Sequence, residues 1–308
     1  MILTDLTLQN FRSYKKAQFE FSPTTTLILG PNTAGKTNLL EAIMLLATGK
    51  SFRAERDREA IRWEAEMSNV KCKMSNVEGG KALEIMLTQG EVGGQKVPLK
   101  KFLVNGVPKR MIDFIGNLAA VLFWPEDLEL VTGNPSLRRR YLDGVLVQTD
   151  REYRRNLLSY ERGLRQRNRL LDLVFEGTAH RHQLVFWDQL LIRTGGYLTD
   201  ARAKFLDFVN SYQLSGVRFH ISYDKSVISE SRLTQYKDEE VAAKATLVGP
   251  HRDDFIVKEK RNGDSFELST YGSRGEQRLA VLWLKLAELA YSEKVMGHRP
   301  VLLLDDIF

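Results

Sequence analysis

The first part of the chain alternates apolar and polar positions in the manner of β-strands. The alternation is clear at 6–8 and 19–21, and a β-branched and apolar run occupies 25–29. At 37–47 the apolar residues recur three or four positions apart, which predicts a helix that ends at Gly49. We therefore expect a strand, a loop and a helix in succession between residues 25 and 49.

A β meander is predicted between residues 70 and 110, where short alternating runs are separated by glycine-containing turns. The Asn-Gly pair among these turns is a strong hairpin signal, because both residues tolerate positive φ. The turn signals are Glu78-Gly79-Gly80, Val92-Gly93-Gly94 and Asn105-Gly106.

From residue 151 to about 214 the pattern changes to that of two long helices. The segment has no proline, and its apolar residues recur at helical spacing, so a hairpin joined near Glu176-Gly177 would bury both stripes. We interpret the stripes as packing core and not as a cofactor site, with a kink at Gly195-Gly196. The stripes are Tyr153, Leu157, Tyr160, Leu164 and Leu171, then Trp187, Leu191, Thr194, Leu198, Ala201, Phe205 and Phe208.

The last third returns to mixed structure. Residues 217–223 alternate, a helix is predicted over about 275–291, and 300–304 reads as a buried strand. The expected organisation is an α/β head domain formed by 1–145 and 240–308, with a helical lobe, 146–239, inserted into it.

The composition is that of a globular protein: 308 residues, 43% hydrophobic and 27% charged. No apolar run approaches the roughly 18 residues of a membrane span, and the N-terminus lacks a signal-peptide layout. The single cysteine, Cys72, excludes an intramolecular disulfide. We expect a soluble, cytoplasmic protein with no membrane partner.

Positive charge is concentrated in one segment. The chain has 45 Lys+Arg against 39 Asp+Glu, a net charge of +6, while ten arginines and only four acids lie between Arg138 and Arg169. On a helical wheel five of these arginines lie opposite the first apolar stripe. A solvated charged face is one interpretation, but the scarcity of acids favours contact with the phosphate backbone of DNA. The five are Arg151, Arg155, Arg162, Arg165 and Arg169.

The neighbouring Arg138 and Arg139, with Arg140, either join this DNA-binding surface or serve the junction between head and lobe.

A phosphate-binding loop, G-x-x-x-x-G-K-[ST], lies between the predicted strand and helix at 25–49. Its glycines let backbone N–H groups face phosphate oxygens, Lys36 reaches the β- and γ-phosphates, and the Thr37 hydroxyl can bind Mg²⁺. We therefore predict ATP and Mg²⁺ as ligands. The residues expected at the nucleotide are Gly30, Pro31, Asn32, Thr33, Ala34, Gly35, Lys36, Thr37 and Asn38.

Asp305 and Asp306 follow the apolar strand at 300–304 in the manner of a Walker B motif. Asp305 would hold Mg²⁺ and Asp306 would orient the attacking water, so Lys36, Asp305 and Asp306 are the candidate catalytic residues. A polar end to a buried strand is the alternative interpretation.

Ser273 to Gln277 opens the predicted helix at 275–291. Ser273 with Glu276 three residues later forms a capping box, which alone explains the pair as a helix start. The stretch also resembles the signature motif of ABC-type ATPases, in which one subunit contacts the ATP held by the phosphate loop of the other. This resemblance implies an ATP-dependent homodimer, with ATP contacted by Ser273, Arg274, Gly275, Glu276 and Gln277.

Several further stretches resemble bacterial RecF proteins, the recombination mediators, in that family's order along the chain. Asn134 is one small departure, where the family usually has a small residue. The stretches are Leu8 to Tyr14, Gly49 to Arg53, Pro125 to Asp143, Val248 to Phe255 and Ser273 to Arg278.

This resemblance implies an ABC-type ATPase head, a mixed sheet with a phosphate loop plus an antiparallel β subdomain, with an inserted α-helical lobe. It also implies ATP-dependent dimerisation, slow DNA-dependent hydrolysis, binding to gapped or duplex DNA at the nucleoid, and a part in the SOS response. RecO and RecR would be partners in loading RecA. The resemblance gives no atomic role to Ser51, Arg53, His251 or Arg252, for which proximity to the nucleotide and a structural ion pair are equal alternatives.

The sequence stops at Phe308, where the family continues with a Ser-Glu-Leu-Asp loop, a helix and a strand. We expect a C-terminally truncated chain that dimerises and hydrolyses ATP less well than its relatives.

Two other classes share the nucleotide motifs: the ATP-binding subunit of an ABC transporter, and an SMC-like or other ABC-type ATPase head that does not act in recombination. The interval between Lys36 and Ser273 is longer than in transporter subunits and too short for the coiled arms of SMC proteins. Binding of the purified protein to DNA at low salt and its release at high salt would favour the recombination protein over these two classes, whereas binding that ignores both ATP and salt would contradict it.

Overall fold

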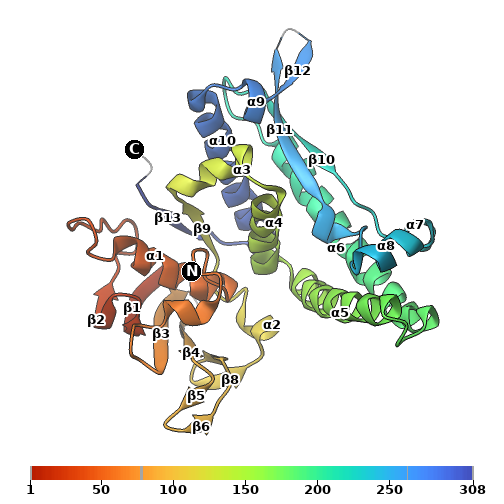
Figure 1. Cartoon of the computed structure of the whole chain (residues 1–308). Helices are drawn as coiled ribbons and strands as arrows, with labels where there is room; N and C mark the ends of the chain where they lie inside the picture. Colours follow the sequence, from red (N-terminus) through yellow and green to blue (C-terminus); the bar gives the residue numbers. More distant parts are fainter. Residues whose placement is uncertain (1, 77–78, 262, 307–308) are drawn as a thin grey trace. The chain divides into compact units, whose positions relative to one another are not determined.

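The computed structural model describes residues 2–76, 79–261 and 263–306. It divides into two compact units (Figure 1). The first unit comprises Met1–Pro125, Val147–Thr149 and Ser292–Phe308, and the second comprises Glu126–Leu146 and Asp150–Tyr291.

A six-stranded antiparallel sheet of order β2-β1-β3-β4-β7-β8 dominates the first unit. Its register places Leu8 opposite Val70 and Val70 opposite Ile85, so that buried side chains share one face, and α1 packs on the sheet through Leu39 and Ile43. The strands are β1 (Ile2–Phe11), β2 (Tyr14–Glu20), β3 (Met67–Asn76), β4 (Gly79–Thr88), β7 (Lys100–Val104) and β8 (Val107–Lys109); the helices are α1 (Lys36–Thr48), η1 (Asp57–Ala60) and α2 (Met111–Phe114).

The predicted meander is confirmed. Asn105 and Gly106, at φ 51° and 77°, join β7 to β8, and Gly93-Gly94 joins the short strands β5 (Glu91–Val92) and β6 (Gln95–Lys96). Both turns place two consecutive residues at positive φ, as two-residue hairpins with type I′ turns require. Glu78, in the third predicted turn, lies outside the described residues.

A second, parallel pair of strands, β9 (Ala120–Phe123) and β13 (Val301–Leu304), completes the described β structure of the first unit. The strand predicted at 25–29 is wrong: no described strand pairs with this segment, and Leu27 and Leu29 are 78% and 81% exposed. The expectation of a buried strand at 300–304 holds for Pro300 and Leu303 only, since Leu302 and Leu304 are about half exposed.

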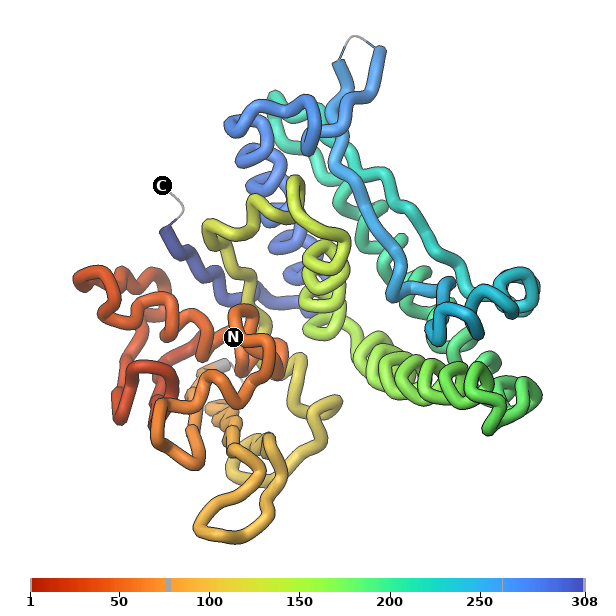
Figure 2. Tube along the Cα trace, viewed as in Figure 1, coloured from red at the N-terminus to blue at the C-terminus, as the bar shows by residue number. Residues whose placement is uncertain are grey.

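The predicted helical hairpin forms the middle of the second unit, where α5 (Arg151–Phe175) leads through 176–184 into α6 (Val185–Ser211), as the chain trace in Figure 2 shows. The helices approach closely because Gly163 faces Leu190 and Leu191, and Gly195 faces Tyr160. The helix α6 continues through the glycine pair at 195–196.

The helix α10 (Arg274–Met296) packs along α6. Trp283 Nε1 donates to the Tyr212 carbonyl oxygen at 3.0 Å, and the Tyr291 ring contacts Phe205 and Phe208. The remaining elements are η2 (Pro125–Leu128), α3 (Glu129–Thr132), α4 (Pro135–Thr149), η3 (Arg181–Leu184), β10 (Phe219–Asp224), α7 (Glu230–Gln235), α8 (Lys237–Ala243), η4 (Pro250–Arg252), β11 (Asp254–Arg261), β12 (Asp264–Glu267) and α9 (Leu268–Tyr271), with a sheet of order β10-β11-β12.

Ion pairs hold the second unit together: Arg202 of α6 binds Asp143 of α4 and Asp253 beside β11, and Arg138 binds Asp254. The head domain at 1–145 and 240–308 with a lobe at 146–239 stays a prediction. Within the described part of the chain, no helix is both long and apolar enough to cross a membrane.

Candidate nucleotide-binding site

The predicted phosphate-binding loop leads directly into α1 in the first unit. Gly30 to Ala34 are exposed, and Gly35, at φ 98°, immediately precedes the helix. A Cβ on Gly35 would lie 2.9 Å from both Ser13 Oγ and Tyr14 Oη, so only glycine fits. The turn between β1 and β2 thus supports the loop at the position where the helix dipole attracts anions.

Lys36 and Thr37 occupy the first turn of α1. Lys36 Nζ donates to the carbonyl oxygens of Gly30 at 2.8 Å and Pro31 at 3.0 Å, which folds its side chain back over the loop. The Thr37 hydroxyl makes no hydrogen bond to any described residue. The Lys36 ammonium can bind the β- and γ-phosphates of a triphosphate, and the Thr37 hydroxyl can bind its Mg²⁺.

A buried carboxylate that the sequence analysis missed organises the residues around this loop. Glu41 of α1 is 0% exposed and accepts hydrogen bonds from Arg12 Nε at 2.9 Å, Arg12 Nη2 at 2.5 Å and Ser51 Oγ at 2.5 Å. The signal was present, since Glu41 is the single charged residue among 37–48, a mostly apolar stretch predicted to be a helix, and a buried charge needs partners.

Arg53 is placed beside the phosphate loop by the same carboxylate. Its Nη1 lies 3.7 Å from Glu41 Oε2 and donates to Asn38 Oδ1 at 3.0 Å, while Asn38 Nδ2 donates to Ser13 Oγ at 3.0 Å. Ser51 and Arg53 both contact Glu41, which agrees with a structural role in an ion-pair cluster. Arg53 also lies next to the phosphate-binding loop through its hydrogen bond to Asn38, so for this residue a structural role does not exclude proximity to the nucleotide.

The acidic strand end lies in the same unit. β13 pairs in parallel with β9, and Asp305 N–H extends this ladder by donating to the Phe123 carbonyl oxygen at 2.9 Å. The helix α1 packs against β9. Leu303 of β13, a strand that Figure 1 shows beside β9, shares a buried cluster with Leu39 of α1. Asp305 is half-buried, whereas Asp306 is exposed at φ 47°.

Oxygen donors from Thr37 and Asp305 suit Mg²⁺, a hard cation that is usually bound by one or two side chains together with substrate phosphates. No cluster of three or more His, Cys, Asp or Glu suited to a metal ion occurs among the described residues.

The signature-like motif lies in the second unit, at the start of α10. Ser273 Oγ accepts from Glu276 N–H at 3.3 Å and Glu276 Oε2 accepts from Ser273 N–H at 2.7 Å, which confirms the capping box. The Ser273 backbone N–H and hydroxyl, followed by Arg261, lower the pKa of the Glu276 carboxyl. Ser273, Arg274 and Gly275 are exposed at the positive end of the helix dipole.

Gln277 has a different role from the other motif residues. It is buried, and its Nε2 donates to the carbonyl oxygens of Leu268 at 2.9 Å and Gly272 at 3.1 Å. Its amide therefore shapes the turn before α10, which leaves Ser273, Arg274 and Gly275 as the motif residues open to a ligand.

The arginines predicted on the outer face of α5 are all exposed. Arg155 lies 3.9 Å from Glu152 across one turn, a long contact between two exposed side chains. Three others, Arg162, Arg165 and Arg169, make no side-chain hydrogen bond or ion pair with any described residue. The apolar stripe on the opposite face is buried or half-buried, as predicted.

Arg138 and Arg139 of α4 are not on this face. Arg138 is buried and makes a bidentate contact with Asp254, at 2.6 and 2.8 Å, while Arg139 Nη1 donates to the Asp253 carbonyl oxygen at 2.8 Å. A paired, buried guanidinium is not available to DNA, so Arg138 has a structural role within the second unit.

His251 also lies inside the second unit. Its Nδ1 shares a 2.7 Å hydrogen bond with the Tyr160 hydroxyl, and its Nε2 is 3.0 Å from the Thr246 carbonyl oxygen. Burial lowers the pKa of the His251 imidazole to about 4. His251 thus makes internal hydrogen bonds that join α5 to the turn before β11, and not the ion pair that was the structural alternative for this residue.

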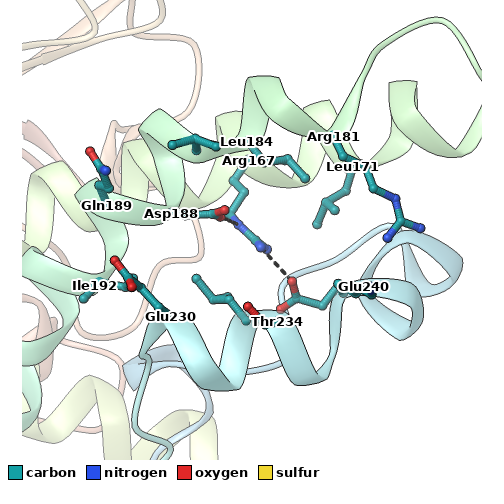
Figure 3. Close-up of a pocket in the computed structure, with 13 residues that line it drawn as sticks. Arg167, Leu171, Arg181, Leu184, Asp188, Gln189, Ile192, Glu230, Thr234 and Glu240 are labelled. Atoms are coloured by element: carbon teal, nitrogen blue, oxygen red, sulfur yellow. Dashed lines mark hydrogen bonds and ion pairs between the residues drawn. The ribbon is translucent and has the colours of Figure 1, made fainter.

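A cavity of about 380 Å³ opens in the second unit beside α5, α6, α7 and α8 (Figure 3). Arg167 points into it, but its nitrogens are engaged: Nε binds Asp188 at 2.6 Å, Nη1 binds Thr246 at 2.9 Å and Nη2 binds Glu240 at 2.7 Å. The charged groups of the lining balance, which makes the cavity a poor phosphate site; they are Arg167, Arg181 and Lys237 against Asp188, Glu230 and Glu240.

Comparison with known proteins agrees with this geometry. A family model described as an AAA domain matches residues 5–109. A RecF protein of Lachnoclostridium phytofermentans is 36% identical over 321 residues, covering 100% of this chain and 86% of that protein, and one of Chloroflexus aurantiacus is 38% identical over 343 residues with the same coverage. Both are named DNA replication and repair protein RecF.

A solved structure described as the recombination mediator RecF with ATP superposes with a TM-score of 0.89 at 32% identity, over 99% of this chain and 85% of the other. The phosphate loop, the acid-terminated strand and this superposition define an ABC-type ATPase head with a helical lobe. Within that class, the identity to full-length relatives shows that the chain belongs to the RecF family of DNA replication and repair proteins.

Proposed function

We propose that this protein is an ATP-dependent DNA-binding recombination mediator in which ATP binding drives dimerisation. The observation that carries the proposal is the phosphate loop on α1, complete with Gly35, Lys36 and Thr37, in a chain of the RecF family.

Each nucleotide-site residue has a distinct part in the proposal. Lys36 and the N–H groups of the loop bind the β- and γ-phosphates, Thr37 and Asp305 hold Mg²⁺, and Asp306 orients the water that attacks the γ-phosphate. Ser273 and the start of α10 contact the triphosphate bound by a second copy, because the exposed end of a helix supplies N–H donors to an anion.

Hydrolysis acts in this proposal as a slow timer that releases the dimer. Asp306 has a shorter side chain than the glutamate found at this place in most ABC-type ATPases, so it reaches less far toward the water. Asp306→Asn should reduce turnover at least tenfold and lengthen the life of the ATP dimer. Unchanged hydrolysis in this variant would remove Asp306 from the mechanism.

The exposed arginines of α5 contact the DNA backbone in this proposal, without reading sequence, on duplex or gapped DNA. Family membership supports a shared role with RecO and RecR in loading RecA, since the solved relatives are described as mediators in the RecFOR pathway.

A matched pair of double variants tests the DNA-binding face. Replacing Arg162 and Arg165 by alanine should lower DNA affinity and reduce the slope of log K against log salt by about 2, because two phosphate contacts are lost. Replacing Arg193 and Lys204, two exposed cations of α6, removes the same charge from another surface. Equal effects from both double variants would mean that α5 is only a solvated face.

A further inference from the structure

The turn between Val248 and Phe255, which the proposed function leaves without a role, is held rigidly in the second unit. Arg202, with a side chain 2% exposed, donates to the Pro250 carbonyl oxygen at 2.7 Å and to Asp253 Oδ2 at 3.0 Å. Asp253 is itself fully buried and accepts hydrogen bonds from Ser226 N–H at 2.7 Å and Tyr223 Oη at 2.5 Å.

Close steric contacts also restrict the beginning of this turn, at Gly249. Gly249 has φ 129°, and a Cβ there would lie 2.3 Å from the Tyr160 hydroxyl oxygen. The His251 ring is hydrogen-bonded at both nitrogens. Because buried polar groups with complete partners favour one geometry, this turn is a firm support for whatever side chain it exposes.

The side chain that it exposes is Arg252. It is the one exposed residue between Val248 and Phe255, and within the described ranges it makes no side-chain hydrogen bond or ion pair. An arginine without a partner, on a turn anchored by a buried arginine and a buried aspartate, is placed for recognition and not for stability.

Arg139 adds a second guanidinium beside the turn. Only its Nη1 is bonded within the described structure, to the Asp253 carbonyl oxygen at 2.8 Å, and the side chain is half-buried. Burial and the charge on Arg202 lower the pKa of Arg139, so an added anion would be favourable. The nearby acids are already paired, with Asp254 on Arg138 and both Asp143 and Asp253 on Arg202.

We propose that Arg252 and Arg139 form a phosphate-binding site on the second unit, separate from the phosphate loop. Guanidinium groups bind phosphate oxygens in a bidentate manner, which suits either a nucleic-acid backbone or the phosphates of a nucleotide. If the bound phosphate belongs to DNA, the inference rests on the proposed DNA-binding function and adds a contact to DNA outside α5.

Three single variants of the whole chain test the site: Arg252→Ala, Arg252→Lys and, as a control, Arg193→Ala. Arg193 is likewise exposed and unpaired among the described residues, but it lies on α6. Fluorescence anisotropy would follow a labelled duplex across a salt series, and a labelled non-hydrolysable ATP analogue in a second arm.

With DNA as the source, Arg252→Ala should weaken duplex binding five- to tenfold and reduce the salt slope by about 1. Arg252→Lys should recover part of the loss, and Arg193→Ala should change affinity less than twofold. All three should keep the melting temperature of the parent, because Arg252 has no internal partner in the described structure.

Weaker binding of the ATP analogue, with duplex binding intact, would support the phosphate site and assign it to a nucleotide. If Arg252→Ala binds both ligands as Arg193→Ala does, the site is overturned. In that event, a loss of DNA binding in the Arg162 and Arg165 double variant would still uphold the proposed function, so the two failures are distinguishable.

Discussion

Single residues divide into those that the sequence pattern could assign and those that needed the structure. Gly35, Lys36 and Thr37 were predictable because a phosphate loop needs these residue types at fixed spacing. Glu41 and its contact to Arg12 were not, because their pairing joins a helix to a turn of the sheet 29 residues away. Spacing rules describe local geometry and carry no information about such long-range ion pairs.

Glu41 should matter for both stability and nucleotide binding. Glu41→Gln removes the charge that balances Arg12 and Arg53, so we expect the free energy of unfolding to fall by about 1–3 kcal/mol. ATP affinity should fall as well, because Arg53 and Asn38 lose their support. Denaturant titration and binding of a fluorescent ATP analogue measure the two effects.

The matched control for Glu41 is Glu84, a partly exposed acid of β4 that pairs with Lys71 at 3.7 Å. Glu84→Gln should change the free energy of unfolding by less than about 1 kcal/mol. Equal losses of stability from the two substitutions would contradict the central role assigned to Glu41.

His251 should make stability depend on pH between about 6.5 and 4. Its folded-state pKa is about 4 against 6.5 for the free side chain, so the unfolded chain binds more protons in this window and stability falls as pH falls. Relative to His251→Gln, which does not titrate, the parent should lose its advantage in unfolding free energy as pH drops from 6.5 to 4. A constant difference across this range would show that the imidazole is not buried in its neutral form.

Among the secondary-structure elements, those with strong local signals were predicted well. The helix α1 ends at Gly49, which adopts φ 73°, and Asn105-Gly106 forms a hairpin, because both depend on backbone preferences of the residues themselves. The failed strand at 25–29 has suitable β-branched residues, but a strand also requires a neighbour for its backbone hydrogen bonds. Local composition does not report whether that neighbour is present.

The two glycines in α6 should respond in opposite ways to alanine. In Gly195→Ala the new Cβ would lie 2.8 Å from Ile228 Cγ2 and 3.1 Å from Tyr160 Cε2, so we expect a loss of about 1–3 kcal/mol in unfolding free energy. Gly196 has no neighbouring atom within 4 Å of its built Cβ, and alanine there should add about 0.5–1 kcal/mol through helix propensity.

Thermal unfolding of both glycine variants measures this contrast, and each serves as the control for the other. A similar shift in both would argue that helix propensity alone governs this part of α6, and that close packing against Tyr160 has no part in it.

At the scale of the whole molecule, the nucleotide motifs lie on different units: Lys36 and Asp305 on the first, Ser273 on the second. The family resemblance of the sequence supplied the dimer hypothesis, and the structure adds that both the loop and the start of α10 are exposed. If ATP is bound between the phosphate loop of one copy and the start of α10 of another, ATP binding would switch the protein from monomer to dimer.

Sedimentation velocity with a non-hydrolysable ATP analogue tests this switch most directly, over a series of protein concentrations and with the parent, Lys36→Ala and Ser273→Ala. The account predicts that the parent forms dimers only with the analogue, that Lys36→Ala neither binds it nor dimerises, and that Ser273→Ala binds it with parental affinity but remains monomeric. Dimerisation of Ser273→Ala at the parental concentration, or a parent that stays monomeric when saturated with the analogue, would contradict a site shared between two copies.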